Sequence, residues 1–108
     1  MITRVVKLEI DPAKAHLFQA SFDEVCDQIR AFPGCLSLEL LQDIESKGVF
    51  FTLSRWTDEQ SFEDYRQSNL FIATWSKVKP LFVSKAQAWS LETEKDLGGV
   101  GSNPFPVS

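Results

Sequence analysis

The chain lacks the features that mark several large classes of protein. It has 108 residues, a net charge of -4 and no run of lysine or arginine, so it offers no basic surface to nucleic acid or to an anionic membrane. No apolar run approaches the roughly 20 residues that a membrane-spanning helix needs. We therefore expect neither nucleic acid nor a membrane as a partner.

Cysteine and histidine are also scarce. Cys26 and Cys35 have no CxxC spacing and no second pair beside them, which argues against a disulfide framework or a zinc site. We interpret both as reduced, mostly buried thiols. The only histidine, His16, falls in the first turns of a predicted helix and is interpreted as a surface residue. No motif implies a flavin, a haem or a metal as cofactor.

The amino terminus shows no signal-peptide pattern. Residues 1–4 enter a strand pattern at once, without an apolar h-region. We therefore expect a cytoplasmic protein. The length predicts one domain, small enough that a partner subunit would help to cover its surface.

The first third of the chain predicts a strand followed by a helix. Residues 2–10 alternate between two faces, and Asp11 and Pro12 supply an N-cap and a first-turn proline. One face of this strand consists of Arg4, Val6, Leu8 and Ile10. The helix that follows has one apolar stripe, at steps of three and four residues, made of Phe18, Phe22, Val25 and Ile29.

The remaining pattern completes an α+β fold. Residues 35–42 and 49–56 predict a hairpin. Thr57 and Gln60 fit a capping box for a second helical region, which Ser68 divides and Pro80 ends. After these come a fourth strand over residues 82–91 and a Gly/Pro-rich tail over residues 95–108, outside a domain of residues 1–94. The order βαββαβ predicts a ferredoxin-like plait, with an antiparallel sheet and the helices on one face.

Residues 55–71 are the most informative stretch. From Trp56 to Phe71 they follow the pattern Trp-x-Asp-x-x-Ser-Phe-x-x-Tyr-x-x-Ser-x-x-Phe. This pattern resembles the antibiotic biosynthesis monooxygenase (ABM) family of small dimeric α+β barrels, whose members often carry Trp-x-Asp-x-x-Ala-Leu-x-x-His-x-x-Ser-x-x-Phe here. The resemblance extends over residues 2–92, with the specific motif confined to residues 56–71.

The resemblance implies a homodimer and a pocket. Two sheets would pack face to face and cover the face that the helices leave bare. A pocket between sheet and helices would be lined by aromatic, substrate-binding side chains, namely Phe18, Phe22, Trp56, Phe62, Phe71 and Trp75. The pattern alone leaves open that these aromatic residues form an ordinary core and fill the pocket themselves.

Two positions depart from the family pattern. Tyr65 and Leu70 stand where relatives often have histidine, and neither titrates near neutral pH. A haem-degrading branch of the family uses an asparagine, a tryptophan and an iron-ligating histidine at positions that align with Val6, Tyr65 and Trp75. An indole nitrogen cannot ligate iron, so we disfavour haem degradation.

The resemblance then implies cofactor-independent oxygenation of an aromatic or quinone-like small molecule. The substrate, once deprotonated, would reduce dioxygen, and the protein would stabilise the developing oxyanion. The candidate catalytic residues are Tyr65, Arg66 and Asn69, with Arg55 as a further polar candidate.

Two alternatives stay open at this point. Surface roles would suit Arg66, through pairing with Glu63 or Asp64, and Asn69, as the start of a helical turn. A non-catalytic, small-molecule-binding or stress-related dimeric module would use the same pocket without a reacting base. The missing histidines favour this second class, and the sequence leaves catalysis itself undecided.

Overall fold

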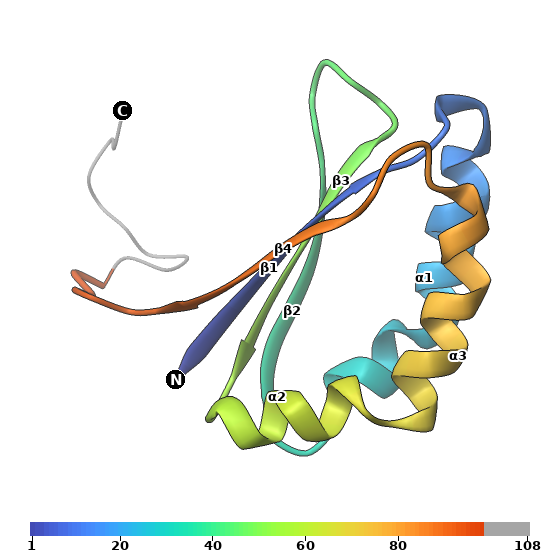
Figure 1. Ribbon diagram of the computed structural model, residues 1–108. Helices are drawn as coiled ribbons and strands as arrows, with labels where there is room; N and C mark the ends of the chain where they lie inside the picture. The colour runs from blue at the N-terminus through green and yellow to red at the C-terminus, as the bar shows by residue number, and fades with distance from the viewer. Residues whose placement is uncertain (99–108) are drawn as a thin grey trace.

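The computed structural model describes residues 1–98, in which a four-stranded antiparallel sheet is covered on one face by helices (Figure 1). The strands are β1 (Ile2–Glu9), β2 (Cys35–Gln42), β3 (Val49–Trp56) and β4 (Gln87–Glu92). They lie in the order β2-β3-β1-β4, and every neighbouring pair is antiparallel. This is the sheet of the ferredoxin-like plait, so the predicted fold class is confirmed.

The helices follow the predicted apolar stripes. They are α1 (Ala15–Arg30), α2 (Glu59–Arg66) and α3 (Asn69–Val78), with short 3-10 helices η1 (Pro12–Lys14) and η2 (Lys79–Leu81). Asp11 caps η1 as predicted, because its carboxylate accepts a hydrogen bond from the Ala13 N–H at 3.0 Å. Phe18 and Ile29 of α1 are buried against the sheet side. The amphipathic stripe therefore sets which face of α1 meets the sheet.

The predicted capping box at Thr57 and Gln60 is wrong by one residue. Asp58 is the N-cap of α2, and its carboxylate accepts from the Ser61 N–H at 2.8 Å. The Thr57 N–H instead donates to the Gly34 carbonyl at 2.9 Å. Thr57 thus extends the pairing of β2 and β3 by one hydrogen bond beyond the end of β3, and the helix begins after it.

The fourth strand, predicted over residues 82–91, is confined to Gln87–Glu92. Phe82 forms only an isolated bridge to Ile10, beyond the end of β1. After η2 the chain first crosses the end of β1 and only then runs antiparallel to that strand. Regular pairing between β1 and β4 therefore begins at Gln87, later than the apolar pattern suggests.

Two separate core clusters join the helices to the sheet. One consists of Leu8, Ile10, Ala15, Phe18, Phe50 and Val78. The other consists of Ile2, Ile29, Cys35, Trp56 and Tyr65. In β3, Phe50 and Trp56 are both 0% exposed and belong to opposite clusters, whereas Thr52 and Ser54 lie between them on the same face. Small side chains thus occupy the middle of the helix-covered face.

The other face of the sheet carries no helix within residues 1–98 (Figure 1). Val5 pairs with Leu53 on one side and with Trp89 on the other, so apolar side chains meet across β3, β1 and β4. Trp89 and Leu91 are 44% and 48% exposed. Because the helices cover only one face of the sheet, the other face was expected to expose apolar side chains, and Trp89 and Leu91 lie there.

The remaining expectations concern the thiols, the membrane and the tail. Cys35 is buried and Cys26 is half-buried, and both are free thiols. Within the described part of the chain, the helices are too short or too polar to cross a membrane. The predicted tail of residues 95–108 lies outside the described residues from position 99 onward.

Gly34 is a point at which the fold tolerates no side chain. Its φ is +91°, and a Cβ atom there would lie 2.4 Å from both the Cβ and the Oγ of Ser61. We expect Gly34→Ala to lower the free energy of unfolding by about 3 kcal/mol, from left-handed backbone strain and the steric clash together. Urea unfolding followed by circular dichroism measures this loss.

The Ser61→Gly background separates the two causes. There the clash with Ser61 is absent and only the 3.1 Å approach to the Thr57 Oγ1 remains, so the same Gly34→Ala change should cost little more than the backbone term of about 1–2 kcal/mol. An equal loss in both backgrounds would show that the contact with Ser61 contributes nothing.

Candidate functional site

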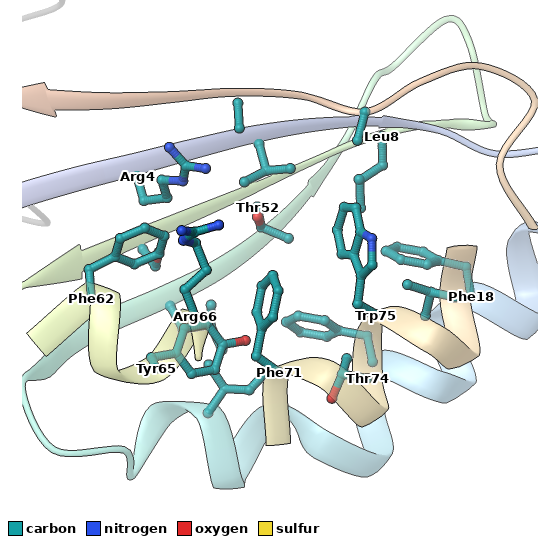
Figure 2. A pocket seen from close by; sticks show the side chains of 18 residues that line it. Arg4, Leu8, Phe18, Thr52, Phe62, Tyr65, Arg66, Phe71, Thr74 and Trp75 are labelled. Atoms are coloured by element: carbon teal, nitrogen blue, oxygen red, sulfur yellow. The ribbon is translucent and has the colours of Figure 1, made fainter. Parts of the chain in front are cut away.

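A cavity of about 370 Å³ lies between the sheet and the helices, in the space between the two core clusters (Figure 2). Its apolar wall is rich in aromatic side chains, namely Phe18, Phe22, Phe62, Tyr65, Phe71 and Trp75. Its polar residues are Arg4, Thr52, Ser54, Arg66 and Thr74. Among residues 1–98 the aromatic side chains therefore leave this space open, which argues against the solid-core alternative.

The aromatic wall is continuous along α2 and α3. The ring of Tyr65 meets that of Phe71 edge to face, with centroids 5.4 Å apart. Phe71 and Trp75 are stacked, with centroids 5.8 Å apart and planes 10° from parallel. Flat apolar surfaces of this kind suit the face or edge of an aromatic ligand.

Tyr65 is fixed from behind by Trp56. The two rings stack at 5.0 Å, and the indole N–H of Trp56 donates to the Ser54 Oγ at 2.9 Å. Burial raises the pKa of Tyr65 to about 12. At physiological pH its hydroxyl is therefore neutral and acts as a hydrogen-bond donor rather than as a base.

Two arginines supply the positive charge of the site. Arg4 is half-buried, its Nη1 donates to the Ser90 Oγ at 3.0 Å, and its guanidinium lies 4.8 Å from the centre of the Phe62 ring. Burial, and then the nearby charge of Arg66, lower the pKa of Arg4. Arg66 donates two hydrogen bonds to Glu63, at 3.1 and 3.0 Å, which raise the pKa of Arg66 and lower that of Glu63.

Seven of the nine residues predicted for the site line the cavity, namely Phe18, Phe22, Phe62, Tyr65, Arg66, Phe71 and Trp75. Trp56 does not, because it is 0% exposed and lies behind Tyr65. Asn69 is the exposed first residue of α3, and Arg55 lies in β3 outside the cavity lining. Arg66 also forms the predicted surface pair with Glu63. It therefore lines the cavity and is paired at the surface at the same time. The catalytic or binding role of each residue stays a prediction.

The cavity also contains polar residues that sequence reasoning did not assign to it. Arg4 shares a strand face with Val6, so the alternation of β1 carries the signal that it points toward the helices. Thr52 and Ser54 carry the same signal in β3. Thr74 gives no sequence signal, yet its hydroxyl is buried and finds no hydrogen-bond partner among residues 1–98.

No group of three or more histidine, cysteine or acidic side chains lies in a metal-binding arrangement within the described residues. The predicted surface position of His16 is confirmed, since it is exposed on α1 and lies outside the cavity lining. Val6, Tyr65 and Trp75, which align with the haem-degrading residues, do line the cavity. They bring no imidazole to it.

The ionisation of Tyr65 has a measurable effect on stability. An unfolded tyrosine ionises at a pH of about 10, whereas the folded pKa is about 12, so the unfolded chain loses its proton first. The contribution of Tyr65 to stability is therefore complete below a pH of about 10 and is lost as the pH rises toward 12, by about 2 kcal/mol. In Tyr65→Phe this part of the pH dependence should disappear.

Tyrosinate absorbance reports this ionisation directly, because the chain has one tyrosine. Circular dichroism recorded in parallel shows whether the protein is still folded. A midpoint near pH 10, as in model peptides, in protein that remains folded would contradict the burial of the hydroxyl.

Solved structures share this fold. A provisionally assigned antibiotic biosynthesis monooxygenase from Caulobacter crescentus CB15 is 22% identical, with a TM-score of 0.82 over 87% of this chain and 90% of that one. Rv0793 from Mycobacterium tuberculosis is 16% identical, with a TM-score of 0.81 over 90% and 98%. A conserved protein from Methanosarcina mazei Go1 is 19% identical, with a TM-score of 0.81 over 87% and 94%.

The family assignment comes from the sequence itself. Similarity at these identities establishes the shared fold alone, and no curated protein matches the chain. Residues 1–76, well over half of the chain, match the family described as antibiotic biosynthesis monooxygenase. The chain therefore belongs to the antibiotic biosynthesis monooxygenase family.

Proposed function

We propose that the protein is a cofactor-independent monooxygenase that oxidises an aromatic or quinone-like small molecule inside the cavity. The observation that carries this proposal is the cavity itself, about 370 Å³ in volume and walled by aromatic side chains. Small-molecule sites have volumes of about 300–1,000 Å³ and the same mixture of apolar wall and few polar groups. Family membership supports the reaction type.

The reaction balances without an external reductant. In a substrate of the anthrone type, a ring methylene loses two hydrogens and gains one oxygen atom to become a carbonyl. The second atom of dioxygen leaves as water with those two hydrogens. The substrate supplies all four electrons that dioxygen accepts, so the protein needs only to bind the substrate, favour its anion and orient it.

Two side chains suit these tasks. The neutral hydroxyl of Tyr65, whose pKa burial raises to about 12, would donate a hydrogen bond to the developing oxyanion. The positive charge of Arg66 would stabilise the deprotonated substrate. The aromatic wall formed by Phe71 and Trp75 would hold the ring. Asn69 has no part in this proposal, because it is exposed outside the cavity.

One observation favours a second candidate, a binding module that performs no reaction. The cavity lining, as far as residues 1–98 define it, contains no histidine and no carboxylate. A general base works best when its pKa is close to the operating pH, and the lining formed by residues 1–98 offers neither of the side-chain types that usually serve. A non-catalytic module would need none.

Oxygen consumption distinguishes the two candidates. We expect purified protein to accelerate oxygen uptake in the presence of one member of a panel of anthrones, hydroquinones and quinols. Tyr65→Phe should slow this uptake by about 100-fold through loss of a positioned donor, and Trp75→Ala should weaken substrate binding. His16→Ala, on the exposed side of α1, is the control and should behave as wild type.

Each other outcome has a defined meaning. Normal uptake by Tyr65→Phe would remove this residue from the chemistry. Ligand-induced tryptophan quenching without any oxygen uptake would establish the binding module and contradict the monooxygenase.

We also propose that the protein is a homodimer in which the uncovered sheet faces pack together. The apolar residues Val5, Leu53 and Trp89, which are paired across neighbouring strands on that face, support this proposal. Burial of such a face stabilises by about 25 cal/mol per Å² of apolar surface, and pairing of two identical faces gives a closed twofold assembly.

Light scattering measures the assembly directly. We expect a dimer mass for wild type at micromolar concentration, and a monomer mass for Val5→Glu, because a charge would be buried at the centre of the interface. Ile72→Glu introduces the same charge at a position that is 54% exposed on α3 and should remain dimeric. A monomeric wild-type protein would contradict the proposal.

A further inference from the structure

Arg4 and Arg66 lie at one end of the cavity, where it meets the surface. Both residues, together with Phe62, line the cavity and also a second hollow of about 490 Å³. That hollow is bounded by exposed side chains such as Gln60 and Ser90. Figure 2 shows both guanidinium groups near the Phe62 ring, at the opposite end of the cavity from Phe18. We call Arg4 and Arg66 the arginine mouth.

The arginine mouth has donors that the described protein does not use. The Nε group of Arg4 is buried and has no hydrogen-bond partner among residues 1–98. Arg66 bonds to Glu63 through Nε and Nη2, and within the same residues its Nη1 makes no hydrogen bond. A buried donor without a partner is unfavourable, and an anionic acceptor satisfies it better than a neutral one.

The charge of the arginine mouth suits an anionic ligand on its cavity side. Glu59 and Glu63 line the outer hollow but not the cavity, so on the cavity side the two guanidinium groups face no carboxylate among the described residues. Burial and the repulsion from Arg66 both lower the pKa of Arg4, so an anion beside the two groups would relieve an existing cost. A carboxylate matches the forked geometry of guanidinium and brings one negative charge to a mouth in which Arg66 is already paired with Glu63.

The position of Arg4 is fixed before any ligand arrives. Ser90 accepts from its Nη1 at 3.0 Å, and the face of the Phe62 ring lies 4.8 Å below the guanidinium carbon. A cation held over an aromatic ring loses little further freedom on binding. The guanidinium group of Arg4 is thus held in place at the open end of an apolar cavity.

We propose that the ligand of this cavity is an aromatic monocarboxylate. Its ring lies against Phe71 and Trp75, and its carboxylate lies at the arginine mouth, between Arg4 and Arg66. This inference rests on the proposed function in taking the cavity as the ligand site, and it adds the chemical class of the ligand. Arg4 is then the residue that selects the anion.

Calorimetric titration with 2-naphthoate and its neutral isostere 2-naphthamide tests the inference. We expect wild type to bind the acid about 10- to 100-fold more tightly than the amide, with an advantage that shrinks as salt is added. Arg4→Met keeps the apolar stem of the side chain and removes its charge, so it should abolish the preference by weakening the binding of the acid far more than that of the amide. Lys14→Met, an equal change of charge on exposed η1, should retain the preference.

Arg66→Met provides a second variant that does not depend on a half-buried position, and it should also reduce the preference. Equal affinity of wild type for the two compounds would overturn the carboxylate inference and leave the cavity as a ligand site. Failure of both compounds to bind at millimolar concentration would overturn the inference and count against the proposed function as well. A preference that survives in both arginine variants would overturn the assignment to the arginine mouth.

Discussion

The stacking of Trp56 on Tyr65 is the contact on which the rest of the site depends. It joins the end of β3 to α2, with ring centroids 5.0 Å apart, and Trp56 is fully buried there. At the other end of the same strand, Phe50 packs against Phe18 of α1 at 4.8 Å. These two aromatic pairs hold the helices away from the sheet at both ends of β3. Thr52 and Ser54 lie between these pairs and are too small to fill the gap that the aromatic side chains create. A cavity therefore remains above the middle of β3. The cavity is therefore a consequence of the large-small-small-large order along one face of a single strand.

An unfilled space of this kind is unfavourable in a chain of 108 residues. Lining atoms lose dispersion contacts, and a small domain has little surplus stability from which to lose them. The two core clusters compensate because each contains a fully buried aromatic side chain. The hydroxyl of Ser54 also has a structural task, since it accepts the indole N–H of Trp56 at 2.9 Å. A larger apolar residue at position 54 would fill part of the cavity and leave that N–H without its acceptor.

Most of the fold follows from the sequence, because the strands and helices carry clear periodicities. The stripe of α1, the start of a helical segment at Ser68 and the order of the elements along the chain were all accessible from local patterns. The site was less accessible, because a motif gives positions along the chain and not depth beneath a surface. Trp56 belongs to the family motif, yet it stands one layer behind Tyr65. Asn69 follows Ser68 immediately, and the break between α2 and α3 turns it toward solvent. Arg4 could be placed on the helix-facing side by alternation alone, but only the packing of Phe62 beneath it shows that it reaches the cavity.

In the proposed reaction, the absence of a histidine or carboxylate from the cavity lining of residues 1–98 places the acid–base chemistry on the ligand. Tyr65 has a pKa of about 12 and remains protonated, while both arginines are permanent cations. Such an environment cannot take up a proton near neutral pH, but it lowers the pKa of an acidic hydroxyl bound close to it, because a positive charge favours the anionic form. A ring whose hydroxyl or methylene is already acidic would therefore ionise in this cavity with water as the proton acceptor. The same positive charge would hold a carboxylate at the arginine mouth. One electrostatic feature can thus serve both binding and the formation of the electron-rich anion that reacts with dioxygen.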